Sequence, residues 1–251
     1  MKRRLATVSF VVAMLIIVAA RTANAENIDL QALTQETQKM SQKNGDMTMA
    51  WWIPEEFWAA SLAQNPQMTT SQIEEFLKVI RPYTIVVVVD GTMGAFGGIT
   101  YKSEDFIRAN TRLLDSQGKS YVPKNEAEVD VNTKNMLQML KPVFVNMLGA
   151  MGQNMHFLLF SGKADNGKQI ANAKDKGQFR IKLGEKEFKW RLPLDAILAA
   201  QNCSNCKQEC KGSWSFCPWC GKKLSKETGR ETIILPVKRA LISGSEEGAR
   251  S

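Results

Sequence analysis

The sequence predicts an α+β fold, with a mixed or antiparallel sheet and flanking helices, from three observations. Residues 84–89 form a β-branched run without alternation, which is typical of a central strand covered on both faces. Residues 178–192 alternate apolar and charged side chains on either side of Gly184, as the two strands of a hairpin do. Strand and helix patterns follow one another without a regular β-α-β alternation, which favours α+β over a parallel α/β sheet.

Residues 1–25 have the three parts of a bacterial export signal. A cationic start at residues 2–4 precedes an apolar run over residues 5–20, and Ala23-Asn24-Ala25 offers the small-x-small pattern that signal peptidase cleaves. The alternative is an uncleaved anchor, but the run is shorter than the roughly 20 residues of a membrane-spanning helix. We therefore expect cleavage before Glu26, a periplasmic or secreted location, and no integral membrane segment after cleavage.

The segment 27–200 is interpreted as one domain, because it is long enough to bury its own core and no linker-like stretch interrupts it. Apolar residues at helical spacing predict its first helix over 28–43. A capping box formed by Ser71 and Glu74 predicts the start of a second helix, which ends before Pro82.

A stripe of methionine and aliphatic residues predicts a third helix over 133–151, and Pro142 should kink or divide it because proline lacks an amide donor. Asp90 and Gly91 are expected to form a turn after the β-branched strand. His156 alternates with apolar neighbours and is expected to be a structural residue. Further strands are expected at residues 99–101, 112–115, 119–122 and 155–160.

All five cysteines lie between residues 203 and 220. Cys203 and Cys206 form one CxxC pair, and Cys217 and Cys220 form a second, ten residues later. Each pair can form a tight turn that directs two thiolates at one ion, and two such turns supply the four sulfur ligands of a tetrahedral zinc site. Gly221, just after the second pair, allows the backbone a positive φ. These four cysteines are therefore the predicted metal ligands, with zinc as the cofactor.

Residues 216–224 (Phe-Cys-Pro-Trp-Cys-Gly-Lys-Lys-Leu) resemble the C-terminal knuckle of the zinc-ribbon family. The resemblance covers residues 203–224 and does not extend to the main domain. It implies a small metal-stabilised module over 201–226, and it implies no particular activity because zinc ribbons have many functions. Residues 227–251 are expected to form a C-terminal arm and a disordered tail.

Two other interpretations of the cysteines remain open. Cys210 is a fifth thiol that either replaces Cys206 as a ligand or stays free. In an exported protein, structural disulfides are the usual fate of cysteines. A redox-active Cys217-Pro-Trp-Cys220 is a further alternative, although the surrounding sequence lacks the βαβ unit of a thioredoxin-like site.

Residues 51–58 combine aromatic and acidic side chains. Trp51, Trp52 and Trp58 with Glu55 and Glu56 would suit an aromatic groove for a glycan or peptide, in which a glutamate acts as the acid of a hydrolase. The simpler interpretation places the tryptophans in the core and the glutamates in the first turn of a helix, where they complement its dipole.

One face of the 178–192 hairpin is cationic, and further lysines surround the cysteine pairs together with two tryptophans. These residues form the candidate binding surface: Arg180, Lys182, Lys189, Arg191, Trp214 and Trp219. Their alternative role is that of an ordinary solvated face. A cationic and aromatic surface suits an acidic envelope protein or another anionic envelope component. The short connection between hairpin and ribbon leads us to expect the two groups to merge into one patch.

Composition excludes several classes of function. The net charge is +8, but four of these charges lie in residues 1–25, so the remainder is only mildly basic and no nucleic acid is expected as a partner. The single histidine excludes histidine-rich metal centres. We therefore predict a non-catalytic binding or scaffold module of the envelope, whose alternatives are an envelope hydrolase using Glu55 or Glu56 and a thiol-disulfide protein.

Overall fold

The computed structural model describes residues 28–43 and 45–224 and divides the chain into two compact units. The main unit contains the described residues up to Ala199 together with Lys211–Ser213. The ribbon unit contains Ala200–Cys210 and residues 214–224. The expected signal peptide at 1–25 and the expected arm at 227–251 lie outside the described residues. The α+β class is confirmed, and the sheets of the described residues are antiparallel.

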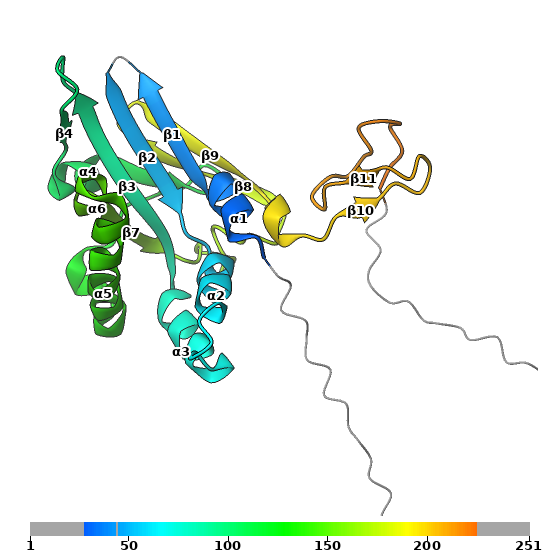
Figure 1. The fold of residues 1–251 in the computed structure, drawn as a ribbon, viewed down its shortest axis with the longest axis horizontal. Helices are drawn as coiled ribbons and strands as arrows, with labels where there is room; N and C mark the ends of the chain where they lie inside the picture. The colour runs from blue at the N-terminus through cyan, green and yellow to red at the C-terminus, as the bar shows by residue number, and fades with distance from the viewer. Residues whose placement is uncertain (1–27, 44, 225–251) are drawn as a thin grey trace, which may run out of the picture. The chain divides into compact units, whose positions relative to one another are not determined.

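The first sheet of the main unit is built around strand β3 (Tyr83–Met93). Strand β2 (Asp46–Trp52) pairs along one edge of β3 and β1 (Gln38–Lys43) extends the sheet beyond it, while β7 (His156–Ser161) and β4 (Ile99–Tyr101) pair along the other edge (Figure 1). The expected strands at 99–101 and 155–160 are thus present as neighbours of β3.

The second sheet has the strand order β6-β5-β8-β9. It consists of two antiparallel hairpins, and both were expected from the sequence. Strands β5 (Thr111–Leu114) and β6 (Ser120–Tyr121) form the first, and β8 (Gly177–Leu183) and β9 (Lys186–Leu192) form the second. Strand β5 pairs with β8 and joins the hairpins.

Successive residues of β3 contribute to two different cores because strand side chains alternate between the faces of a sheet. Val86 and Val88 face the second sheet and pack in one cluster with Phe179 and Trp190. Val87 and Val89 face the helices and pack in a second cluster that includes residues of α3 and α5. This arrangement confirms that the β-branched run is a central strand covered on both faces.

The helices are short except for α5. They are α1 (Leu30–Thr37), α2 (Glu55–Ala63), α3 (Thr70–Ile80), α4 (Glu104–Asn110), α5 (Val131–Leu148) and α6 (Ala150–Gln153), with 3-10 turns at Glu126–Glu128 and Asp195–Ile197. Within the part of the chain that the structure describes, none of them has both the length and the hydropathy needed to cross a bilayer.

The first predicted helix is too long. Helix α1 ends at Thr37, and the expected remainder of the helix forms strand β1, which pairs with β2 along its whole length. Leu33 and Thr37 of the apolar stripe are buried, whereas the side chain of Met40 is 54% exposed. The strand forms because it pairs with β2 in a hairpin, at whose turn Gly45 adopts a φ of 81°. The apolar periodicity of residues 38–43 does not record this pairing.

Three local predictions were also wrong in detail. The capping box of α3 is formed by Thr69 and Gln72, two residues before the predicted one. Pro142 lies within α5 and does not divide it, while a kink there stays a prediction. The break comes at Gly149, which adopts a φ of 57° before α6. Asp90 lies within β3 and pairs with Thr48 of β2, so it is not in a turn.

Candidate functional site

The two CxxC pairs of the ribbon unit form turns with the same hydrogen bonds. In each, the N–H of the first cysteine donates to the carbonyl oxygen five residues later, and the N–H four residues later donates back to the cysteine carbonyl, at 2.8–2.9 Å. The residue that closes each turn has a positive φ, which is 60° at Lys207 and 71° at Gly221. Glycine was predicted for this role at the second turn, and lysine performs it at the first.

Short pieces of strand flank these turns. Strand β10 (Gln201–Asn202) pairs with β11 (Glu209–Cys210) around the first turn. An isolated bridge between Phe216 and Lys223 flanks the second. These bonds fix the turns locally, although the ribbon unit has few apolar side chains with which to stabilise itself. Its core contains the sulfur-bearing residues and little else beyond Leu224 and Trp214.

The four predicted ligands come together. The sulfur atoms of Cys203, Cys206, Cys217 and Cys220 lie within 4.8 Å of one another. The closest contacts join different turns, with 3.5 Å between Cys203 Sγ and Cys220 Sγ and 3.5 Å between Cys206 Sγ and Cys217 Sγ. A tetrahedral ion with metal–sulfur bonds of about 2.3 Å would set the sulfurs ~3.8 Å apart. The cluster could therefore hold one metal ion.

All five cysteines are free thiols in the structure. Cys210, whose role the sequence left open, is buried and lies outside the group of four, and its thiol contacts the carbonyl oxygen of Gln208 at 3.5 Å. It therefore does not replace Cys206 in the cluster.

The thiols of Cys206 and Cys220 differ in acidity. The backbone N–H of Lys222, helped by the Asn205 side chain, lowers the pKa of Cys220 to about 6. The backbone N–H of Gln208 acts in the same direction on Cys206, but burial and the neighbouring thiols outweigh it and raise the pKa of Cys206 to about 12. The metal-free cluster thus retains protons at neutral pH, and a cation that binds four thiolates must displace them.

Four sulfur donors around one ion leave no open coordination position. Catalytic metal sites keep such a position for water or substrate, whereas closed sites hold the fold together. An ion held by all four sulfurs would therefore be structural, which would suit a unit with so small a core.

The predicted binding residues are distributed over both units. Trp214 and Trp219 belong to the ribbon unit, where their ring centroids lie 6.0 Å apart and the side chain of Trp219 is 59% exposed. The cationic hairpin residues belong to the main unit. The merged patch expected from the sequence stays a prediction.

The outer face of the second sheet carries the cations of the hairpin. Arg180 pairs with Lys189 across β8 and β9, while the alternate residues of both strands are buried. Arg112, which the sequence reasoning missed, lies opposite Lys182 on the same face. The face also carries Glu187, which forms ion pairs with Arg180 at 3.5 Å and with Lys182 at 3.8 Å.

The aromatic and acidic segment at 51–58 is mainly core. Trp51, Trp52 and Trp58 are 2–8% exposed. Glu55 and Glu56 occupy the first turn of α2, and Glu55 accepts hydrogen bonds from Arg81 at 2.7 and 2.9 Å. Burial raises the pKa of Glu56, as a hydrolase acid would require. However, the cavity beside Trp52 and Glu55 has a volume of about 50 Å³, against roughly 300 Å³ or more for a ligand pocket.

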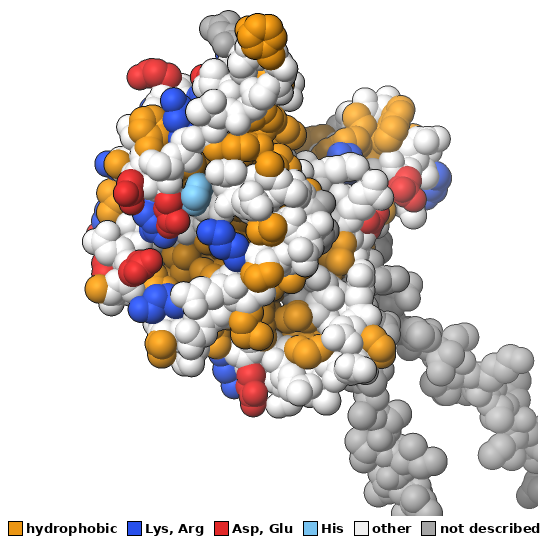
Figure 2. Space-filling view, turned by 60° about the vertical axis from the view of Figure 1, so that its left-hand side comes forward, with side chains coloured by type: hydrophobic (Ala, Val, Ile, Leu, Met, Phe, Trp, Pro, Cys, Tyr) orange, Lys and Arg blue, Asp and Glu red, His pale blue; other side chains and the backbone are white. Residues whose placement is uncertain are grey.

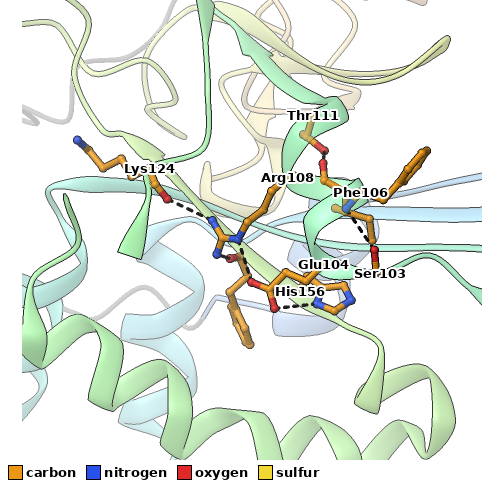
Figure 3. A network of polar contacts seen from close by, with 9 residues as sticks. Ser103, Glu104, Phe106, Arg108, Thr111, Lys124 and His156 are labelled. Carbon is orange, nitrogen blue, oxygen red and sulfur yellow. Dashed lines mark hydrogen bonds and ion pairs between the residues drawn. The ribbon is translucent and has the colours of Figure 1, made fainter. Parts of the chain in front are cut away.

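The structure also brings together a polar network that the sequence reasoning did not predict (Figure 3). Glu104 lies between Arg108 Nε, at 2.9 Å, and His156 Nδ1, at 3.3 Å. The hydrogen bond with His156, opposed by partial burial and helped by Arg108, lowers the pKa of Glu104 to about 2. His156 Nε2 is buried and has no hydrogen-bond partner among the described residues. Glu104 and Arg108 are four residues apart on α4, and this spacing is the one feature of the network that the sequence could have indicated.

A second unpredicted cluster lies where the two sheets meet. Lys186, at the start of β9, donates from Nζ to Asp90 Oδ1 and to Thr48 Oγ1, both at 2.7 Å. Thr48 also donates to Asp90. The Thr48 hydroxyl is fully buried, and these contacts of Lys186 join the second sheet to the first.

Comparisons of the chain with family models, with curated proteins and with solved structures find no match.

Proposed function

We propose that this chain is an exported, non-catalytic binding or scaffold protein of the bacterial cell envelope, stabilised in part by a structural zinc ribbon. Its binding surface would be the cationic outer face of the second sheet, assisted by Trp214 and Trp219 of the ribbon unit. Its partner would be an acidic envelope protein or another anionic envelope component.

The observation that carries this proposal is the pairing of like charges on that face. Arg180 lies directly opposite Lys189, and Arg112 lies opposite Lys182. Like charges in opposite positions destabilise a sheet, and Glu187 forms ion pairs with only two of the four cations. A surface that binds an anion supplies a reason for a sequence that keeps this unfavourable arrangement.

The competing explanation is that the charges protect an exposed strand edge. Strand β9 is an edge strand of its sheet within the described residues, and lysine or arginine on an edge prevents pairing with other chains. The two explanations make different predictions. Glutamate at the same positions would still protect the edge, but only cations can bind an anion.

Zinc is the proposed metal for three reasons. The ligand set consists of four cysteine sulfurs, their separations suit a tetrahedral ion, and the second turn resembles that of a zinc ribbon. Bound zinc would replace the missing apolar core of the ribbon unit. It would have no catalytic part, since four thiolates close its coordination shell.

The test is capture of partners from envelope extract by the purified protein, with metal content measured on the same sample. Reversing Arg180, Lys182, Lys189 and Arg191 to glutamate should abolish capture without unfolding the main unit, because these side chains lie on the outer face. Capture by the unmodified protein should weaken as salt rises, since screening shortens to about 8 Å at physiological ionic strength. Protein isolated from cells should begin at Glu26 and contain about one zinc per chain.

The matched control is the double substitution Glu55→Gln and Glu56→Gln, which should leave capture unchanged. If this double substitution removes the activity of the protein in cells, the alternative function, an envelope hydrolase that uses Glu55 or Glu56, is the better explanation. If the charge-reversed protein still captures the same partners, the cationic face is not the binding surface. A purified protein that has neither metal nor free thiols would instead support structural disulfides.

A further inference from the structure

A cavity of about 430 Å³ lies on the helical side of the main unit, between α5, the start of β7 and the segment that follows β6. We call it the α5 groove. Its floor is apolar and is formed by Val129, Leu137, Met155 and Leu159. These side chains are 1–9% exposed, so their positions are fixed by the core. A preformed groove of this size falls in the range of small-molecule sites, which is roughly 300–1,000 Å³.

The rim of the groove is predominantly cationic. Its lining contains four cations, Arg108, Lys124, Lys134 and Lys141, and two carboxylates, Glu104 and Glu126. Figure 2 shows this side of the molecule, where the single histidine, drawn in pale blue, lies among acidic, basic and hydrophobic side chains. A solvated helix face has no requirement for an apolar floor, and a protein core has no requirement for cations. The combination therefore suggests a ligand with an anionic end and an apolar end.

The four cations are not equally available to a ligand. Arg108 is engaged by Glu104 and by two backbone carbonyl oxygens. Lys124 Nζ lies 3.9 Å from a carboxylate oxygen of Glu128. The ammonium groups of Lys134 and Lys141 form no ion pair with any residue that the structure describes; Lys134 bonds only a carbonyl oxygen, at 3.3 Å.

Lys134 and Lys141 are also suitably placed relative to each other. Both lie on α5, seven residues apart, and a spacing of two helical turns puts them on the same side of the helix, about 10 Å apart along its axis. A carboxylate held by either ammonium group would leave an alkyl chain free to lie along the apolar floor. Lysine is well suited to such a rim because its own methylene chain covers apolar surface while its charge stays in water.

We propose that the α5 groove binds a free medium-chain fatty acid. Its carboxylate would interact with Lys134 or Lys141, and its alkyl chain would pack against Leu137, Met155 and Leu159. The groove is too small for a folded partner. Asn135 and Gln138 also line it but are exposed, and its buried floor is apolar, which suits an alkyl chain better than the ring hydroxyls of a sugar. This binding is independent of the proposed binding of an anionic partner by the second sheet, because α5 and the second sheet pack against opposite faces of the first sheet.

The test is isothermal titration of the full purified chain with dodecanoate at low salt, below the concentration at which the ligand forms micelles. Saturable binding of about one dodecanoate per chain is expected. Butyrate tests the contribution of the alkyl chain of the ligand and should bind far more weakly than dodecanoate, because it buries little apolar surface. Dodecyltrimethylammonium tests the head group and should not bind, because it carries the charge of the rim.

The double substitution Lys134→Glu and Lys141→Glu should weaken dodecanoate binding roughly tenfold, since it replaces the attraction of exposed ion pairs by repulsion. Lys78→Glu on α3 is the matched control, because Lys78 is exposed and does not line the groove. If circular dichroism shows that the double variant does not fold, the variant Val131→Trp is tested in its place. Val131 is 58% exposed at the rim, and an indole there should occupy the groove and weaken binding.

Three results would overturn the proposal: no saturable binding of dodecanoate, equal binding of the cationic amphiphile, or unchanged affinity in the folded groove variants. Binding to anionic phospholipid vesicles in place of free dodecanoate would also overturn it, since the membrane would then be the ligand. Reversal of the cationic sheet face should leave dodecanoate affinity unchanged, so failure of this proposal and failure of the proposed function can be distinguished.

Discussion

The substitution Lys186→Met should destabilise the main unit by about 3 kcal/mol, because it leaves a buried carboxylate without its counter-ion. Lys186 Nζ lies 2.7 Å from Asp90 Oδ1 and 3.3 Å from Asp46 Oδ2. The Asp90 side chain is 6% exposed, whereas that of Lys186 is 25% exposed. Removing one partner of a buried ion pair costs about 3–5 kcal/mol, and the partial exposure of Lys186 favours the lower end.

The assay is urea unfolding at pH 7, followed by circular dichroism and by the fluorescence of the buried tryptophans. The double variant Lys186→Met and Asp90→Asn should recover much of the lost stability, since a neutral amide needs no counter-ion and still accepts the hydrogen bond from Thr48. Lys182→Met is the matched control. Its ion pair with Glu187 is 3.8 Å long and about half exposed, so its loss should change stability by less than about 1 kcal/mol.

Two outcomes would refute this reasoning. A loss of less than about 1 kcal/mol in Lys186→Met would mean that water or Thr48 already satisfies Asp90. A double variant that loses the sum of the two single losses would mean that Lys186 and Asp90 do not depend on each other.

Three further predictions concern the cysteine turns and the polar network. Cys217→Ser should release the bound metal and unfold the ribbon unit, while the main unit keeps its structure because the two units have separate cores. Metal analysis and circular dichroism would check this prediction, and retained metal would contradict it. Gly221→Ala should destabilise the ribbon unit by about 1 kcal/mol in thermal unfolding, because an L-residue is strained at a φ of 71°. Lys207→Gly should be neutral or stabilising, because glycine relieves the same strain at a φ of 60°. The pKa of Glu104 is lowered from 4.5 to about 2, so its contribution to stability is present above pH 4.5 and disappears as the pH falls through 2. With its side chain 43% exposed, solvent screening limits this contribution to about 1 kcal/mol. Glu104→Gln should lose that much at pH 6 in urea titrations, and the loss should shrink as the pH falls through 2.

The candidate metal centre could be predicted from the sequence because its geometry is local. The spacing within each CxxC pair directs both sulfurs to the same side of one turn, and ten intervening residues suffice to bring two turns together. The same holds for the 178–192 hairpin, whose buried and exposed sides follow from alternation about one turn. What locality could not reveal was which residue closes the first turn, since Lys207 adopts a conformation that its type disfavours.

The two errors in the predicted helices have different causes. The end of α1 depends on the pairing of β1 with β2, and the end of α5 depends on Gly149 and not on Pro142. In both places the local pattern was compatible with a longer helix. A strand pairing decided the end of α1, and a glycine with a positive φ decided the end of α5.

The sequence by itself determined the fold class, the central strand, the two hairpins and the four clustered cysteines, because each depends on composition or on spacing within about twenty residues. Only the tertiary structure decided the contacts that join distant parts of the chain. Asp90 meets Lys186 across 96 residues, His156 meets Glu104 across 52, and the α5 groove gathers residues from four separate segments. Such contacts between distant residues arise from strand order and register. These depend on how all the apolar faces pack together, and the sequence of a single segment does not contain that information.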